Sequence, residues 1–346
     1  MDRLHLLREA LEIAHYAHRH RGGRFVVALD DGVQPAELLT DQRFAAAVGA
    51  CLCLVGPVGE APPGPWTTVT AARLTAEPSL LDASAPTVLV DCPAGATVAS
   101  GVALAGRIGA RRLMFVTRNL PAAFGDRLHF LVPEARARLG ADAPGRLRLL
   151  VEAAAQGLPV VMLHAGAGCV FEELFTHHGA GVLIGDPVEE AIRVATPEDA
   201  ADIFLLLRGD MERGTVRRVD EGEVARSAAD HLVYTIDGVV VGTARLAPHG
   251  DWAELSRFAT LPRYRGRGRA RQLGLALIRW AHARGFTDLF ALSIDPRMWA
   301  FFESLDFAAA ERTALPASWQ AGYDFGRPSR AFHRRTEATG GDPNPA

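Results

Sequence analysis

The residues with the clearest chemical meaning form the run RGRGRA at positions 265–270. An apolar stretch over residues 253–260 precedes this run, and a long helical pattern follows it as far as Arg284. A helix that begins directly after a strand presents free backbone N–H groups in the positive field of its dipole. Because glycine has no Cβ, Gly266 and Gly268 let a phosphate approach that backbone. The run therefore predicts a cradle for a pyrophosphate, with added positive charge from its arginines.

Two common phosphate-binding loops are excluded. The chain contains no lysine, since all 37 of its basic residues are arginines, and a Walker loop needs that ammonium. A Schiff base and a lysine general base are excluded for the same reason. Arg271 stands where the dinucleotide pattern G-x-G-x-x-G has its last glycine. Taken alone, a run of arginine and glycine is also typical of a solvated loop.

The run resembles the acyl-CoA signature of the GNAT acetyltransferase superfamily, [Q/R]-x-x-G-x-[G/A], at Arg265, Gly268 and Ala270. Downstream, the segment FFESLDF at 301–307 is similar to the superfamily pattern FYEKLGF. Phe302 stands where many members have a tyrosine that acts as a general acid. The resemblance implies a GNAT α/β domain that binds acetyl-CoA as cosubstrate and whose chemistry does not use that tyrosine.

More specifically, the chain resembles the bacterial N-acetylglutamate synthase family. The segments AEL at 253–255 and YDFGRPSR at 323–330 are similar to its motifs in the acetyltransferase domain. EELFT at 172–176 and HRGGRFVV at 20–27 resemble its motifs in the preceding domain. The likeness runs from about residue 8 to 334 and is weak from about 30 to 140. It implies transfer of acetyl from acetyl-CoA to the α-amine of L-glutamate, a step of arginine biosynthesis.

Two α/β domains follow from this resemblance. Residues 1–189 are expected to form a shortened amino-acid-kinase-like domain, a parallel-sheet sandwich, and residues 190–336 the GNAT domain. Kinase relatives have a lysine and a glycine turn where this chain reads ALDDG at 28–32. Without them phosphoryl transfer is excluded, so we interpret the first domain as structural or regulatory. Residues 337–346 are rich in glycine, proline and aspartate and are predicted to be a disordered tail.

Acetyl transfer to an amine needs a base, a donor to the thioester oxygen and a proton for the leaving thiolate. By the resemblance, Glu254 is the base, acting through a water, and Ser293 protonates the thiolate. An ordinary strand-end carboxylate and a hydroxyl bonded to its own backbone remain the alternatives. Backbone N–H groups near Thr260 and Leu261 are the expected oxyanion donors. The expected coenzyme-binding residues are Thr260, Leu261, Arg265, Gly266, Arg267, Gly268, Arg269 and Ala270.

Glutamate carries two carboxylates. Arginine is the residue expected to bind them, because its planar guanidinium donates two parallel hydrogen bonds. Arg327 and Arg218 match the substrate arginines of the family, although the spacing at Arg218 needs an adjustment of one residue. Arg257 stands where the family has a cysteine. We group it with the substrate residues, while contacts with the coenzyme or with a neighbouring carboxylate stay open.

The resemblance also implies an arginine effector and a homo-oligomer. Arginine inhibits bacterial family members by binding the kinase-like domain, and Tyr16 and Glu173 match positions of that effector site. The histidine of the site is replaced by an apolar residue near Val160. Whether arginine regulates this chain stays open.

The elements that position these residues follow from hydrophobic periodicity. Short apolar strands without clear alternation are separated by helices, which is typical of a parallel sheet covered on both faces. The predicted strands of the first domain are 25–29, 51–55, 87–91, 112–117, 159–163 and 181–184, and its helices are 4–17, 98–108, 144–156 and 168–177. The second domain is predicted to have strands at 191–194, 231–236, 239–247, 253–260 and 288–293, a helix from Thr196, a helix after the RGRGRA run, and a helix at 297–304.

Charge and composition exclude several classes of partner. The net charge is −3 and the pI is about 6.5, so no basic field attracts nucleic acid or an anionic membrane. The apolar stretch 153–171 is interrupted by Gln156, Gly157, Pro159 and His164, so no transmembrane segment is expected. The four cysteines lack the spacing of metal ligands, which predicts no metal, buried free thiols and a cytoplasmic protein.

Two other functions stay open at this point. One is a GNAT enzyme that acetylates a different amine. The other is a non-catalytic sensor that binds coenzyme A or arginine, a reading to which Arg257 and Phe302 give weight.

Overall fold

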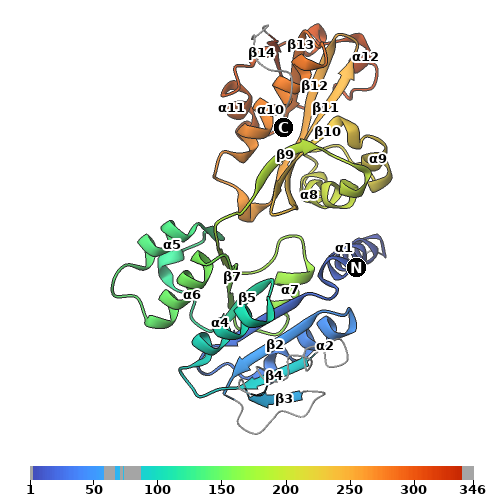
Figure 1. The fold of residues 1–346 in the computed structure, drawn as a ribbon. Coiled ribbons are helices and arrows are strands. Elements are labelled where there is room, and N and C mark those ends of the chain that lie inside the picture. The colour runs from blue at the N-terminus through green and yellow to red at the C-terminus, as the bar shows by residue number, and fades with distance from the viewer. Residues whose placement is uncertain (1–2, 58–66, 71–72, 74–86, 337–346) are drawn as a thin grey trace. The chain divides into compact units, whose positions relative to one another are not determined.

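The computed structural model describes residues 3–57, 67–70, 73 and 87–336 (Figure 1). The chain divides into two compact units, Met1–Asp186 and Pro187–Ala346, a boundary close to the predicted division after residue 189. The predicted tail 337–346 lies outside the described residues, as does the Pro-rich segment 60–66. Each unit is described by itself.

The N-terminal unit is built on a mostly parallel sheet. Within the described residues its eight strands follow the order β3-β4-β2-β1-β5-β7-β8-β6. Neighbours pair in parallel except β7 and β8, which are antiparallel. The strands are β1 (Arg24–Leu29), β2 (Cys51–Gly56), β3 (Thr67–Thr70), β4 (Thr87–Asp91), β5 (Arg112–Thr117), β6 (His129–Phe130), β7 (Val160–His164) and β8 (Val182–Ile184).

Two groups of helices pack on this sheet. Because the central strands are covered in this way, they are apolar along their whole length. Helices α4 (Thr97–Ile108), α5 (Val132–Leu139) and α6 (Gly145–Ala155) pack together and reach β1, β5 and β7. Helices α1 (Arg3–His20), α2 (Leu39–Ala47) and α7 (Cys169–Phe175) form the second group. All six residues of β2 are buried, including Cys51 and Cys53.

The C-terminal unit contains a mixed sheet in the order β14-β15-β13-β12-β11-β10-β9. Only β12 and β13 pair in parallel, and this pairing ends at Glu254 and Phe290. The strands are β9 (Glu190–Val194), β10 (His231–Ile236), β11 (Val239–His249), β12 (Trp252–Thr260), β13 (Asp288–Ser293), β14 (Ala308–Ala310) and β15 (Arg330–Arg335).

Helices cover both faces of this second sheet (Figure 1). Helices α8 (Ala200–Glu212) and α9 (Glu221–Arg226) lie on one face, and α10 (Arg269–Ala283) and α11 (Pro296–Glu303) lie on the other. A further short helix, α12 (Ala317–Gln320), precedes β15. Leu273 and Leu277 of α10 are fully buried in the core. The sheet therefore holds the start of α10 at a fixed place beside β12.

The structure confirms the predicted fold class of two α/β units. Its strands at 112–117, 231–236 and 288–293 have the predicted bounds. The sequence did not predict α2, α5, α9 and α12, which are short. All four cysteines are buried and free. Among the described residues no helix is both long and apolar enough to cross a bilayer.

Candidate active site

A cavity of about 910 Å³ opens in the C-terminal unit beside β12. It begins where the pairing of β12 with β13 ends, because the two strands separate beyond Glu254. Arginines outnumber carboxylates among the residues that line it. Seven of the residues predicted from sequence lie in this lining: Glu254, Arg257, Thr260, Arg265, Ala270, Ser293 and Arg327.

The start of α10 has the geometry of an anion cradle. Gly266 and Gly268 have φ angles of +81° and +73°, which side chains rarely adopt. A Cβ at either glycine would meet no protein atom within 4 Å, so the space in front of the backbone is open. Gln272 N donates to Gly268 O at 2.9 Å as the first bond of the helix. The backbone N–H groups of the first turn consequently have no acceptor within the helix.

The arginines of the RGRGRA run have different roles. The exposed Arg265 lines the cavity, and its Nε donates to Thr260 O at 2.9 Å. Arg269 is buried and points away to Glu190 Oε1 at 2.7 Å and to Tyr264 O at 3.2 Å. The side chain of Arg269 is thus not a contact for a coenzyme; it fixes the first residue of α10 to β9.

Glu254 is a carboxylate in the cavity wall with an altered acidity. Its side-chain oxygens form no hydrogen bond with another residue in the described part of the chain. Burial raises the pKa of Glu254 above its ordinary value, and the charges of Arg245, Arg257 and Arg217 oppose this effect. A carboxylate whose proton affinity is raised in this way is a suitable general base near neutral pH.

A β-bulge interrupts β12 at Arg257 and Phe258, beyond Glu254. The register with β11 shifts between Thr243 and Arg245, and Arg257 takes a left-handed φ of +54°. Bulges redirect side chains and leave backbone groups outside the ladder. The prediction for Leu261 needs correction, because its N–H donates to Val241 O at 2.9 Å and is not available as an oxyanion donor.

Ser293 ends β13 and lines the cavity. Its Oγ accepts a hydrogen bond from Asp295 N at 3.0 Å. A hydroxyl that accepts this bond keeps its own proton for a ligand. Phe302 also lines the cavity and provides no hydroxyl of its own.

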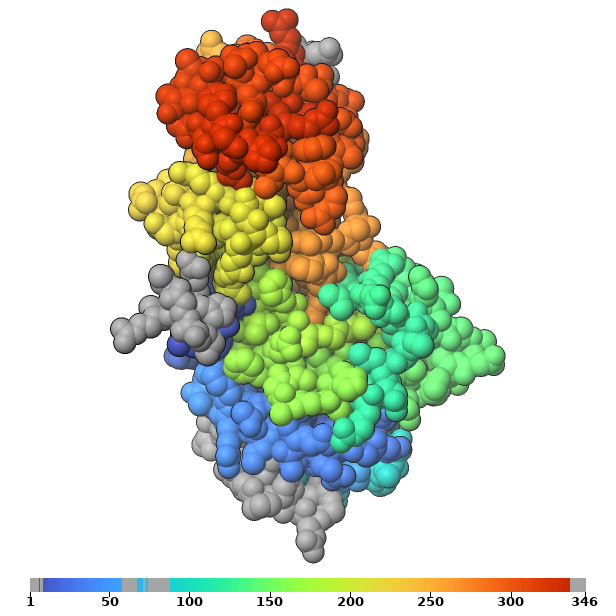
Figure 2. All heavy atoms as spheres, turned by 180° about the vertical axis from the view of Figure 1, so that it is seen from behind, coloured from blue at the N-terminus to red at the C-terminus, as the bar shows by residue number. Residues whose placement is uncertain are grey.

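Arg327 reaches the cavity from the loop between α12 and β15. Its Nη2 donates to the carbonyl of Gly214 at 2.7 Å. This bond joins the segment around Gly214 to the C-terminal segment. In the space-filling view the yellow surface, which contains residues 200–230, borders the red one (Figure 2). No carboxylate among the described residues pairs with Arg327. Its remaining N–H groups are therefore available to an anionic ligand.

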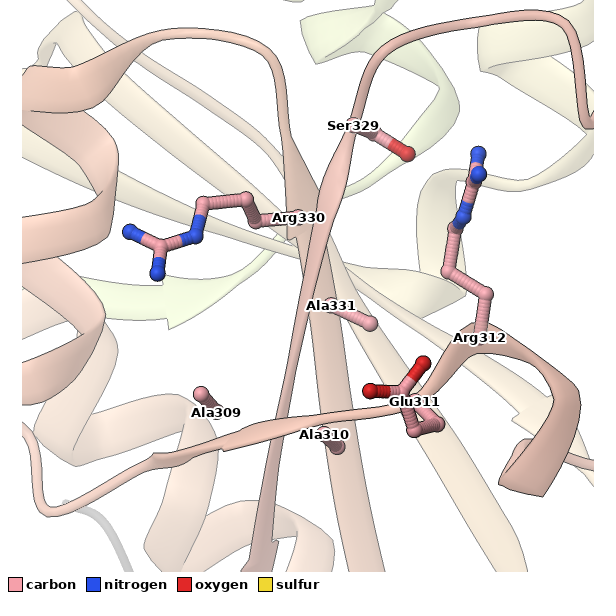
Figure 3. Close-up of a pocket in the computed structure, with 7 residues that line it drawn as sticks. All are labelled: Ala309, Ala310, Glu311, Arg312, Ser329, Arg330 and Ala331. Atoms are coloured by element: carbon pink, nitrogen blue, oxygen red, sulfur yellow. The ribbon is translucent and has the colours of Figure 1, made fainter.

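Arg312 holds the loop that carries Arg327. Its Nη1 donates to the carbonyls of Phe325 and Arg327 at 3.1 and 2.7 Å. Arg312 also lines a second, more open hollow of about 350 Å³. Figure 3 shows its side chain on the same side of β15 as Ser329 and opposite to Arg330. This contact was not visible in the sequence, where Arg312 is one of many arginines outside a motif.

The structure places Arg218 differently from the prediction. Arg218 is exposed and is not among the residues that line the cavity, whereas its neighbour Arg217 is. The match of Arg218 to the family motif needed a shift of one residue, and this misfit could have indicated Arg217 instead. Glu223, which pairs with Arg217, and Arg245, which also lines the cavity, carried no sequence signal.

Tyr16 and Glu173 lie in the N-terminal unit at the packing of α1 on α7. The hydroxyl of Tyr16 lies 2.7 Å from His177 Nδ1. The carboxylate of Glu173 is buried, with one oxygen bonded to Arg112 and the other accepting from Ala180 N at 2.8 Å. A guanidinium of the chain thus already occupies the carboxylate that was expected to bind an effector.

Comparison with known proteins accounts for the C-terminal unit. Residues 201–307 match the profile of the acetyltransferase (GNAT) family. The C-terminal unit is a GNAT domain. The start of α10, the bulge in β12 and the point where the pairing of β12 with β13 ends all lie within the matched residues.

The similarity to known proteins extends over more residues than the GNAT profile matches. An amino-acid acetyltransferase from Azotobacter vinelandii is 32% identical over 205 residues, which are 57% of this chain and 46% of that protein. One from Ectopseudomonas mendocina is 29% identical over 211 residues, 59% of this chain and 48% of that protein. The chain spans about half the length of these curated relatives.

A solved structure matches both units. The N-acetylglutamate synthase from Neisseria gonorrhoeae, complexed with coenzyme A and L-arginine, aligns with a TM-score of 0.57 at 19% identity. The alignment covers 94% of this chain and 97% of that one. At this identity the likeness establishes the fold, a mostly parallel N-terminal sheet followed by a GNAT domain.

Proposed function

We propose that this protein transfers the acetyl group of acetyl-CoA to the α-amine of L-glutamate. The observation that carries the proposal is one cavity that joins three features. These are the start of α10, which the cavity reaches at Arg265 and Ala270 on either side of two left-handed glycines, the carboxylate of Glu254, and the guanidinium of Arg327, whose side chain bonds only to a carbonyl among the described residues. The names of the relatives, amino-acid acetyltransferases, support the same reaction.

The cradle would hold the coenzyme through its backbone. The pyrophosphate would accept hydrogen bonds from the amides of residues 266–270, in the positive field at the start of α10. Arg265 would add a charge at the cavity wall. No metal is required for this binding, since amides and guanidinium groups supply the donors.

Glu254 and Ser293 would move the protons. Glu254 would take a proton from the ammonium of the acceptor, through a water, to free the attacking lone pair. The amine nitrogen would then form a bond to the thioester carbon and lose a second proton to solvent. Collapse of the tetrahedral intermediate would break the carbon–sulfur bond. Ser293 would donate its proton to the departing thiolate and regain one from solvent. Backbone N–H groups near Thr260 and the bulge would stabilise the oxyanion.

The N-terminal unit has a structural or regulatory role in this proposal. Asp41, which is almost fully buried, accepts hydrogen bonds from Gly168 N and Phe171 N at 2.9 and 2.7 Å. A side chain of the protein thus fills the start of α7. Cytoplasmic location and a homo-oligomeric state stay predictions.

A thiol-release assay tests the proposal. The protein is incubated with acetyl-CoA and each of the twenty amino acids in turn, and free coenzyme A is measured. We expect release with glutamate and much less with glutamine. Release with a different amine and none with glutamate would identify an acetyltransferase for another acceptor. No release with any amino acid would support a non-catalytic sensor.

A further inference from the structure

Two arginines share a single carboxylate at the wall of the cavity. Arg217 Nη2 and Arg257 Nη2 both donate to Oε1 of Glu223, at 2.9 and 2.6 Å. Both arginines line the cavity, whereas Glu223, on α9, does not. One negative charge therefore faces two positive charges, and this wall carries an excess of positive charge.

Arg257 is the buried member of the pair. Its side chain is 6% exposed, and its Nη1 has no hydrogen-bond partner within the described residues. Its backbone has the left-handed φ of the bulge, a conformation that persists in an arginine only where the surroundings hold it. A buried guanidinium with an unpaired N–H group lacks an acceptor, and a carboxylate is the acceptor that fits its fork.

Apart from Glu254, the groups beside Arg257 that line the cavity are not acids. Arg245, on the neighbouring strand, reaches Asp230 at 3.3 Å and leaves its Nε without a partner. Burial, together with Arg257 and Arg245, lowers the pKa of His231 to about 3, so this imidazole is neutral. On the side of the cavity that also holds Glu254, the neighbours of Arg257 are thus the cation Arg245 and the neutral imidazole of His231.

We propose that Arg257, held in place by Glu223, binds the α-carboxylate of the amino-acid acceptor, while Arg327 binds the carboxylate of its side chain. This inference rests on the proposed function. Arg257 and Glu254 lie on the same strand, separated by two residues. The α-carboxylate is attached to the carbon that carries the attacking amine, so it is the carboxylate nearest to the base. Arg327 comes from a different element and serves the other end of the acceptor.

Amide analogues of glutamate separate the two carboxylates. Isoglutamine lacks the α-carboxylate, and glutamine lacks the side-chain carboxylate. For the wild-type protein we expect both to be poor acceptors. Arg257→Gln should lower kcat/KM for glutamate by about 30-fold or more, mainly through KM, as expected when one partner of a buried charge pair is removed. It should abolish the preference for glutamate over isoglutamine and retain the preference over glutamine. Arg327→Gln should show the reverse pattern.

Three further variants separate binding from structure. Arg257→Lys keeps the charge but not the fork and should restore part of the affinity. Glu223→Gln should raise the KM for glutamate without changing coenzyme A affinity, since Glu223 positions Arg257 and Arg217 and does not line the cavity itself. Arg226→Gln removes an exposed arginine from the same helix and should change neither. If Arg257→Gln does not fold, Arg257→Lys, which keeps the buried charge, is compared across the same three acceptors.

Two results would overturn this inference alone. In one, an active Arg257 variant keeps the full preference for glutamate over isoglutamine. In the other, it loses the preference over glutamine instead, which would assign Arg257 to the side-chain carboxylate. A folded wild-type protein that binds acetyl-CoA and does not acetylate glutamate would overturn the proposed function, and this inference with it.

Discussion

At the scale of single residues, Arg327 is a cation whose partners in the structure are neutral. If it binds a carboxylate of glutamate, Arg327→Ala removes one partner of a charge-assisted pair. Such a loss amounts to roughly 2–5 kcal/mol, or about 30- to several-thousand-fold in kcat/KM. We expect a strong rise in the KM for glutamate with coenzyme A affinity nearly unchanged, measured by initial rates and by calorimetry. Arg226→Ala is the control. Normal glutamate kinetics in Arg327→Ala would contradict the assignment.

Glu254 is the residue whose ionisation should set the acidic limb of the pH profile. As a base it must be deprotonated, so kcat/KM should fall as the pH falls through its pKa. Because burial raises that pKa, we expect the limb at higher pH than an ordinary glutamate would give. Glu254→Gln should lower kcat strongly and remove this limb. A profile unchanged in shape in a slower Glu254→Gln protein would assign the limb to another group.

The same raised pKa predicts an effect on stability. A folded state that holds the proton of Glu254 more tightly than the unfolded chain gains stability at low pH, and this gain is lost as the pH rises towards the raised pKa. At neutral pH the ionised, desolvated carboxylate is therefore a cost to the fold. Glu254→Gln should raise the Tm at pH 7 and change it less at pH 4, as measured by thermal unfolding. A lower Tm at pH 7 would contradict this prediction.

At the scale of elements, the cradle depends on Gly268. Gly268 has a left-handed φ, and the space at its Cβ position is open. A side chain introduced at this position would therefore lie in the path of the phosphate. We expect Gly268→Val to lose coenzyme A binding and Gly268→Ala to lose part of it, measured by calorimetry. Gly250, which is also left-handed and open, gives the matched control Gly250→Val away from the cradle. Unchanged affinity in a folded Gly268→Val protein would contradict the cradle.

The elements also show what a single sequence could predict. The strands 112–117, 231–236 and 288–293 are long apolar runs between polar ends, so their bounds could be predicted. The bulge at Arg257 could not, because an arginine in a left-handed conformation results from its neighbours and not from its own propensity. Arg217 was missed by one position, since residues 214–219 have no period that fixes which arginine faces the cavity. The partners of Arg257 and Arg327 lie far along the chain.

At the scale of the whole molecule, one unit is expected to be catalytic and the other not. No lysine follows β1, the turn after it has a single glycine, Gly32, preceded by two aspartates, and Asp41 fills the start of α7. We therefore expect no transfer of phosphate from ATP to N-acetylglutamate, measured with labelled ATP in protein free of contaminating kinase. A known amino-acid kinase in the same assay is the positive control. Detectable transfer that follows the protein through purification would contradict this.

The unpaired amides at the start of α10 should also be visible to solvent deuterium. Amides without an acceptor exchange rapidly, whereas those in a bonded helix exchange slowly. In the free protein the first turn of α10 should therefore take up deuterium faster than the stretch from Gln272 onward. Acetyl-CoA should slow the uptake in the first turn and leave the rest of the helix unchanged. The occupancy of the cradle could then be followed by mass spectrometry, independently of any acceptor.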